Sequence, residues 1–229
     1  MTTQLVTTTS TELAKTKAPA LPFGPVEYDR QYQDQLNNIL RQYFITIDNL
    51  IGQLSLSTGG SGFYVPYGAF QDTTIQTIPA NTAQVMTLNT VDFASDVSIV
   101  SGSRITVTKA GIYNLQWSGQ FRNTDNAIHD ISVWLRQDGP GVGIDIPGSK
   151  GVISIPARKS ASAGDEAHNI YGWNYFVSLQ ADEFVEIWWY SESAQVSLTT
   201  FPATTAPAVV TPSTASVVAT MTFVSALPA

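Results

Sequence analysis

The sequence predicts an all-β sandwich with an N-terminal helix, and three observations support this prediction. Short alternating apolar segments recur after residue 67, turn residues separate them, and no helical period continues beyond residue 55. Only 13% of the residues are charged, about half the usual share of roughly 25%. Thr, Ser, Ala, Val and Ile take their place, as is typical of strand-rich proteins with neutral surfaces. A chain of 229 residues has room for one sandwich or jelly-roll domain and an appendage.

Residues 1–24 are predicted to form an extended arm rich in Thr and Pro. The arm carries few large apolar side chains, so it cannot bury enough surface to offset the entropy lost on ordering. We therefore expect a partner protein to hold residues 1–30. The candidate docking residues are Leu21, Pro22, Phe23 and Tyr28.

An amphipathic trimerisation helix is predicted over residues 25–54. Pro25 suits the first helical position, and Glu27 and Asp29 would fall in the first turn. Apolar residues follow at heptad spacing, and a wide stripe of this kind favours a three-stranded bundle over a two-stranded zipper. An amphipathic helix packed on its own domain is the alternative. Fewer than three heptads are marginal for a free coiled coil, so we expect the trimer to be held elsewhere as well. The heptad residues are Leu36, Leu40, Tyr43, Ile47, Leu50 and Leu54.

Residues 55–66 are rich in Gly and Ser and are predicted to be a flexible linker. Beyond it, residues 67–229 are expected to form about eight to ten short strands. The clearest are a hairpin within 103–121, a strand within 129–137, a strand pair within 169–191 and a last strand within 215–227. The Pro- and Thr-rich segment 202–215 is predicted to be an extended loop.

The aromatic segment 184–190 is apolar on both sides of a predicted strand. Val185, Ile187 and Trp189 would share one face, and we expect that face to lie in the core. The other face carries the candidate subunit interface, or else an aromatic ligand surface, because Tyr and Trp suit both roles. These candidate interface residues are Phe184, Trp188 and Tyr190.

Several function classes are not expected. The net charge is −7 and the 11 basic residues are scattered, so no nucleic acid partner is predicted. The chain has no Cys, no apolar run long enough to insert into a membrane, and no secretory signal at its N-terminus. The glycine-rich segment 139–143 lacks the lysine and the helix of a phosphate-binding loop.

Neither a catalytic site nor a metal site is predicted, and no cofactor is expected. His129 and His168 are far apart in the sequence, with no third ligand at zinc-site spacing. Asp125, Asp130, Asp165 and Glu166 lie in expected loops without a calcium-loop pattern. A carboxylate pair for glycoside hydrolysis has no supporting motif.

Segments 104–121, 177–189 and 221–227 resemble the C1q/TNF-like jelly roll, which has a Gly-Tyr hairpin, a later strand pair and a short C-terminal strand. The longer segment 68–118 is similar to C1q-like domains in structural proteins of tailed bacteriophages, particularly those of cyanobacteria and marine bacteria. The leader 21–44 resembles a segment that precedes a helix in phage fibre-like proteins. The chain is shorter than most receptor-binding fibres and lacks their shaft repeats.

This resemblance implies a homotrimeric virion protein made in the cytoplasm of a host bacterium. Residues 1–30 would contact other virion proteins, and the jelly-roll knob at 67–229 would contact a neighbouring protein or a host surface glycan or protein. A short tail fibre or adhesin is the leading prediction, and a capsid decoration or head fibre protein is the alternative. A carbohydrate-active tailspike is a remote alternative, and a cytokine-like ligand is a further one.

Overall fold

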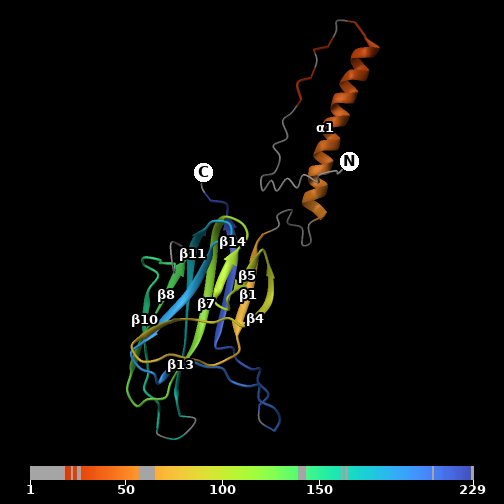
Figure 1. The fold of residues 1–229 in the computed structure, drawn as a ribbon. Coiled ribbons are helices and arrows are strands. Elements are labelled where there is room, and N and C mark those ends of the chain that lie inside the picture. Colours follow the sequence, from red (N-terminus) through yellow and green to blue (C-terminus); the bar gives the residue numbers. More distant parts are fainter. Residues whose placement is uncertain are drawn as a thin grey trace, which may run out of the picture. The chain divides into compact units, whose positions relative to one another are not determined.

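The computed structural model describes residues 19–21, 23–24, 27–56, 65–138, 143–160, 162, 165–207 and 209–227. The chain divides into two compact units, Met1–Tyr64 and Val65–Ala229. The first unit contains the helix and the second contains the sheets (Figure 1). No helix in the described part combines the length and the apolar character that crossing a bilayer requires.

Helix α1 (Arg30–Leu56) begins where Asp29 caps its first turn. The Asp29 carboxylate accepts a hydrogen bond of 2.8 Å from the backbone N–H of Gln31, which is otherwise without an intrahelical partner. The expectation that Pro25 would be the first helical residue is therefore wrong. Asp29 lies at the cap and outside the first turn, since its side chain competes well for the free N–H groups there.

Two antiparallel sheets form the second unit, and the predicted all-β sandwich is confirmed. The first sheet contains β1 (Tyr67–Asp72), β2 (Gln76–Thr77), β4 (Thr90–Ser95), β7 (Gly111–Asn123), β11 (Ala167–Leu179), β13 (Val196–Leu198) and β14 (Val217–Ser225). The second contains β3 (Thr82–Val85), β5 (Val97–Val100), β6 (Arg104–Val107), β8 (His129–Gln137), β9 (Ile144–Asp145), β10 (Gly151–Ile155) and β12 (Phe184–Ser191). The described residues thus form more strands than the eight to ten expected, because several are only two to four residues long.

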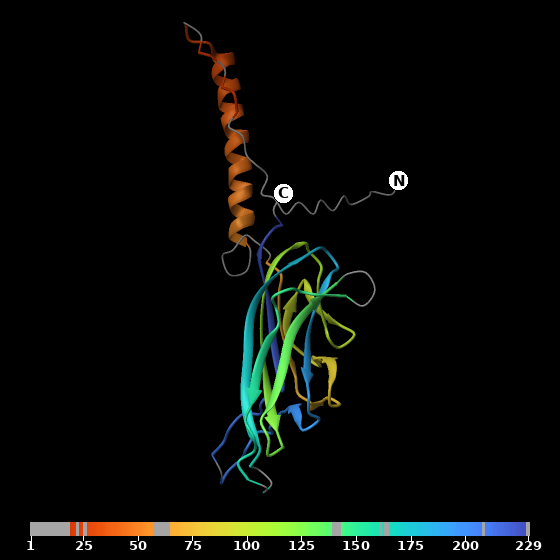
Figure 2. The ribbon, with the colours of Figure 1, turned by 90° about the vertical axis from the view of Figure 1, so that its left-hand side faces the viewer.

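Strands β7 and β11 are the longest and pair along their whole length, from Asn123 opposite Ala167 to Gly111 opposite Leu179 (Figures 1 and 2). On its other side, residues 112–119 of β7 pair with β14, and residues 121–123 pair with β13. The segment between β13 and β14 leaves the sheet and returns to it. Its described residues form only isolated bridges, Phe201 with Thr214 and Thr204 with Thr211, so the expectation of an extended loop at 202–215 agrees with the structure.

The core lies between the inner faces of the two sheets. Alternate residues of β7, including Tyr113, Leu115 and Phe121, are completely buried, as are Trp189 and Val185 of β12. The rings of Phe121 and Trp189 meet edge to face at 5.9 Å and join the two sheets. Strict alternation in the sequence placed these side chains correctly, because residues two apart on a strand share a face.

Two glycines leave room for phenylalanine rings within this core. A Cβ on Gly68 would lie 2.3 Å from the Phe70 ring. A Cβ on Gly119 would lie 2.8 Å from Leu198 and 3.2 Å from the Phe121 ring. In both strands the ring two residues further on covers the glycine, so a larger residue at either position would displace a buried ring.

Tyr113 provides a prediction for alkaline pH. Its phenol is buried and donates to the backbone oxygen of Lys109 at 2.7 Å, and burial, followed by the nearby Asp96 charge, raises the pKa of Tyr113 to about 12. Unfolded tyrosine releases its proton near pH 10 while the folded protein keeps it, so the free energy of unfolding should fall by about 2 kcal/mol between pH 10 and 12. Urea unfolding of Tyr113→Phe across this range should give a shallower decline. Equal declines in both proteins would contradict this assignment.

Candidate functional site: an uncharged sheet face and a helix seam

The outer face of the first sheet exposes neutral side chains on five neighbouring strands, β11, β7, β14, β1 and β4. Gln116 of β7 lies opposite Asn174 of β11 and Thr220 of β14, and β1 and β4 continue the sheet beyond β14. We call this surface the neutral face. Its members are Tyr67, Phe93, Asn114, Gln116, Ser118, Ile170, Asn174, Phe176, Val218, Thr220 and Thr222.

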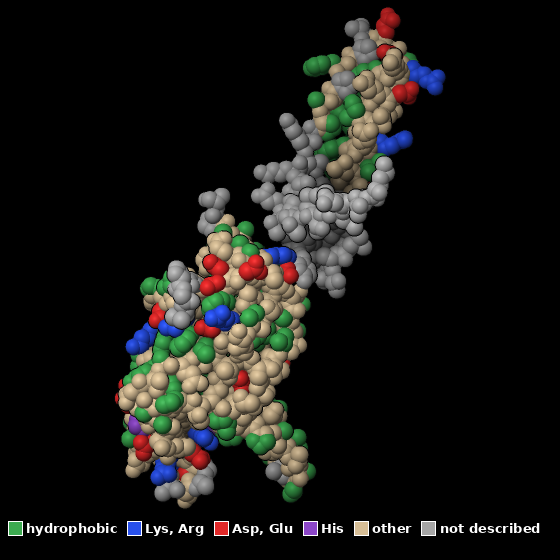
Figure 3. All heavy atoms as spheres, in the orientation of Figure 1, with side chains coloured by type: hydrophobic (Ala, Val, Ile, Leu, Met, Phe, Trp, Pro, Cys, Tyr) green, Lys and Arg blue, Asp and Glu red, His purple; other side chains and the backbone are tan. Residues whose placement is uncertain are grey.

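Large apolar side chains stand exposed on the neutral face. Ile170 is 68% exposed, Phe93 63% and Phe176 57%, although each belongs to a regular strand. In the described part of this face, charged side chains occur only at the margins, at Asp92 in β4 and Arg122 near the end of β7. For comparison, Figure 3 shows the side of the sandwich that is seen in Figure 1, where charged side chains are interspersed among hydrophobic and other ones. An apolar and uncharged sheet face of this breadth is typical of an association surface.

One polar group on the neutral face lacks a partner. The side-chain oxygen of Asn114 is buried and accepts no hydrogen bond from any described residue. It lies in the same cross-strand row as Phe176 and Thr222. An unpaired buried acceptor of this kind is costly.

The heptad residues of α1 form a second candidate association surface. Leu36, Leu40, Tyr43 and Ile47 are each only half-buried, while Phe44 and Ile45 are more than half exposed. The side chains of Leu50 and Leu54 lie outside the described residues. An isolated helix gains little stability from such a stripe, so the seam suits packing against other helices.

The predicted interface strand β12 is covered largely by its own chain. Phe184 is only 7% exposed, and the Arg104 guanidinium lies 4.3 Å from its ring centre. Glu186 lies two residues further along β12, and its carboxylate is buried. This carboxylate accepts hydrogen bonds from Ser103 at 3.0 Å, Arg104 at 3.3 Å and the Trp188 indole at 3.0 Å. The second apolar face of this strand therefore does not need another subunit to cover it.

Trp188 and Tyr190 keep some exposure. The Arg136 guanidinium lies 4.0 Å from the Trp188 ring centre, and the Tyr190 hydroxyl donates to the Asn81 side chain at 3.0 Å. A role for Phe184, Trp188 and Tyr190 in subunit contact stays a prediction. The neutral face offers more exposed apolar side chains. The alternation on β11 did not reveal it because large aromatic side chains occupy both sides of that strand, Trp173 on one side and Phe176 on the other.

The predicted docking residues are exposed where the structure describes them. Phe23 is 99% exposed, Tyr28 84% and Leu21 50%, and Pro22 lies outside the described residues. Three large apolar groups within eight residues suit contact with another protein, so docking through residues 1–30 stays a prediction.

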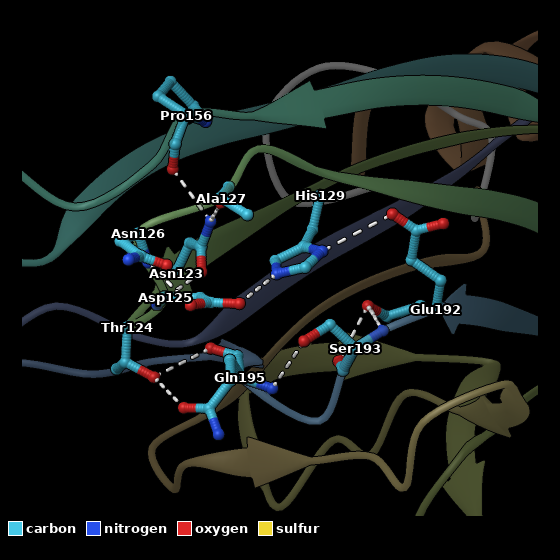
Figure 4. Close-up of polar contacts among 11 residues, drawn as sticks. Asn123, Thr124, Asp125, Asn126, Ala127, His129, Pro156, Glu192, Ser193 and Gln195 are labelled. Carbon is cyan, nitrogen blue, oxygen red and sulfur yellow. Dashed lines mark hydrogen bonds and ion pairs between the residues drawn. The ribbon is translucent and has the colours of Figure 1, made fainter.

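His129 joins two turns at one end of the sandwich (Figure 4). Its Nε2 lies 2.7 Å from Asp125 and its Nδ1 lies 3.4 Å from Glu192, which follows β12. The hydrogen bond from His129 is the main reason that the pKa of Asp125 lies below its ordinary value. Asn123, which is buried, supports the same turn by donating to the backbone oxygens of Ala127 and Pro156 at 2.8 and 2.9 Å.

The remaining groups have separate structural partners, and Asp130 lies in β8 rather than in the loop that was expected for it. His168 packs edge to face on Phe201 at 5.0 Å, and burial lowers the pKa of His168. Asp130 accepts a hydrogen bond of 2.6 Å from Ser154, and Asp165 accepts one from Ser160. No group of three His, Asp or Glu side chains among the described residues is arranged to hold a metal ion.

No protein-family model matches the chain, and no match was found among curated proteins.

Proposed function

We propose that the chain is a homotrimeric structural protein of a tailed-phage virion, serving as a short tail fibre or adhesin-like component. The neutral face carries this proposal. Three copies arranged around an axis must bring equivalent surfaces close together, and like charges on such surfaces would repel. A face with exposed Ile170 and Phe176 and with charges only at its margins meets that requirement.

The strand order supports a jelly-roll form for the knob. The chain passes from β7 in the first sheet to β8 and β10 in the second, returns to β11, crosses to β12 and ends on β14 in the first sheet. Repeated crossing between two sheets is the property that distinguishes a jelly roll from a simple meander. The segments that resemble C1q/TNF-like proteins, 104–121, 177–189 and 221–227, supply β6 and β7, β12 with part of β11, and most of β14.

The molar mass in solution tests the proposal directly. We expect light scattering on the purified full chain at micromolar concentration to give three times the chain mass of 24.7 kDa. A monomer or a dimer under these conditions would overturn the homotrimer. Antibody labelling of particles in negative stain would then test the virion location.

The helix seam provides a second prediction. Leu40→Glu places a charge in the middle of the seam and should weaken the trimer by about 10-fold or more, because an unpaired charge is disfavoured in an apolar contact. Asn38→Glu, on an exposed position of the same helix, is the matched control and should leave association unchanged. Sedimentation velocity over a dilution series measures both. Equal dissociation of the two variants would remove the seam from the assembly.

The exposed docking residues suit two virion positions. In a tail fibre, loss of the protein should reduce adsorption to the host. In a capsid decoration or head fibre protein, loss should change particle stability while adsorption is preserved. We propose no catalytic activity, and release of reducing sugar from host polysaccharide by the purified chain would favour the tailspike alternative.

A further inference from the structure

A hollow of about 530 Å³ lies on the outer face of the second sheet, between β8, the β9–β10 segment and the end of β12. This volume is within the range of about 300–1,000 Å³ that small-ligand sites occupy. The hollow belongs to the sheet opposite the neutral face, so association through the neutral face leaves it open. Its lining includes Ser132, Trp134, Asp145, Pro147, Lys150 and Tyr190.

Two aromatic side chains from neighbouring strands line the hollow, and both are held in place. The Trp134 indole N–H donates to Asp145 at 2.9 Å, and its ring lies 6.4 Å from the Trp188 ring at an interplanar angle of 30°. Tyr190 is fixed by its hydroxyl bond to Asn81. Both rings are half-buried, so one part of each is packed and another part is accessible.

The 144–150 wall of the hollow is also well fixed. The backbone N–H of Ile146 donates to the Leu135 oxygen at 2.9 Å, and the Ser149 hydroxyl, on a buried residue, donates to the Ile146 oxygen at 2.7 Å. Gly148 has a φ of +79°, which gives the turn a conformation that other residues rarely adopt. A wall that is already ordered loses little entropy when a ligand binds.

The accessible polar groups have opposite charges. The Oδ1 atom of Asp145 accepts two hydrogen bonds, one from Trp134 at 2.9 Å and one from Arg136 at 2.8 Å. No described residue donates a hydrogen bond to its Oδ2 atom. The Arg136 hydrogen bond also keeps the pKa of Asp145 below its ordinary value, so the group remains an anionic acceptor. The Lys150 side chain, on an exposed residue, supplies a cationic donor in the same hollow.

We infer that this hollow binds a neutral sugar residue of a glycan. The apolar C–H face of a pyranose ring would pack on Trp134 or Tyr190, while its hydroxyl groups donate to Asp145 and accept from Lys150. A purely apolar ligand would desolvate both charges without bonding them, and an anionic ligand would meet the Asp145 carboxylate. The binding step does not require the trimer. It rests on the proposed function only in that a host glycan is the source of the sugar.

The test uses the purified full chain and methyl glycosides of glucose, galactose, mannose and N-acetylglucosamine. Saturation-transfer NMR should detect at least one of them, and titration should give a measurable dissociation constant at millimolar or lower concentration. Trp134→Ala should weaken that binding at least tenfold, and Asp145→Asn at least threefold. Phe201→Ala, which removes an exposed ring outside the hollow, is the matched control and should bind as the wild type does.

Light scattering and thermal unfolding of the same samples separate the inference from the proposed function. Loss of binding counts as support only for variants that keep the oligomer mass and the melting temperature of the wild type. Trp134→Phe, which retains a ring, should bind better than Trp134→Ala and covers the case in which the alanine variant misfolds. The inference is overturned if no neutral glycoside binds the folded protein, or if binding is unaffected by Trp134→Ala and Asp145→Asn.

Discussion

Replacement of Phe176 by glutamate is expected to dissociate the trimer into folded monomers. Phe176 is 57% exposed in a single chain, so the monomer loses little packing when this ring is removed. In an assembly formed through the neutral face, the new carboxylate would be buried without a partner at a cost of about 3 kcal/mol, which corresponds to roughly 100-fold weaker association. Light scattering over a dilution series measures the change, and circular dichroism verifies that the monomer remains folded.

Val152→Glu is the matched control for this experiment. Val152 is 59% exposed and lies in β10 of the opposite sheet, so the two substitutions add the same charge at equally accessible strand positions. We expect Val152→Glu to leave the trimer intact. If both variants associate as strongly as the wild type, the neutral face is not the interface. If only Val152→Glu dissociates, the second sheet is the interface instead.

Two adjacent tryptophans should differ greatly in their contribution to stability. Trp189 is completely buried and packs on Phe121 between the sheets, so Trp189→Ala should lower the free energy of unfolding by about 3–5 kcal/mol. Trp188 lies on the outer face under Arg136, and Trp188→Ala should lower it by only about 1–2 kcal/mol. Urea denaturation of the two variants under identical conditions provides the comparison.

The same pair tests the interface predicted from the aromatic segment. If Trp188 contacts another subunit, Trp188→Ala should reduce the oligomer mass at a concentration where the wild type is fully assembled. If Trp188 contacts only residues of its own chain, Trp188→Ala should leave the oligomer mass unchanged and should lower the free energy of unfolding only slightly. Comparable losses of stability in the two variants would contradict the assignment of opposite faces.

The all-β sandwich was predictable because alternation determines which side of a strand faces the core, and β7 and β8 alternate almost without interruption. The number of strands was underestimated, since pieces as short as β2 and β9 have no pattern of their own and exist only because a longer strand lies beside them. The start of α1 was misplaced for a similar reason, because Pro25 and Asp29 both suit a helix start and only the cap geometry distinguishes them.

The candidate sites were less predictable than the fold. Arg104 and Arg136 cover the outer aromatic side chains of β12 from the paired strands β6 and β8. These strands are distant from β12 in the sequence, so no local pattern predicts the contacts. The sugar-binding hollow likewise combines β8, β9 and β12. One local signal was present, since Trp134 shares a strand face with Ser132 and Arg136, where an aromatic residue is unexpected on a solvated surface.

The excursion between β13 and β14 has a consequence for how this protein can change. The Thr199 N–H donates to the Gln120 oxygen at 2.8 Å, and the Gln120 N–H donates to the Ser216 oxygen at 2.8 Å, so both ends of the excursion are anchored on one residue of β7. Because closing a loop between fixed, adjacent ends depends only weakly on its length, residues can be added to or removed from 202–213 at little thermodynamic cost. This segment is therefore a natural insertion point, where new peptide can be displayed while the sandwich that supports it stays unchanged.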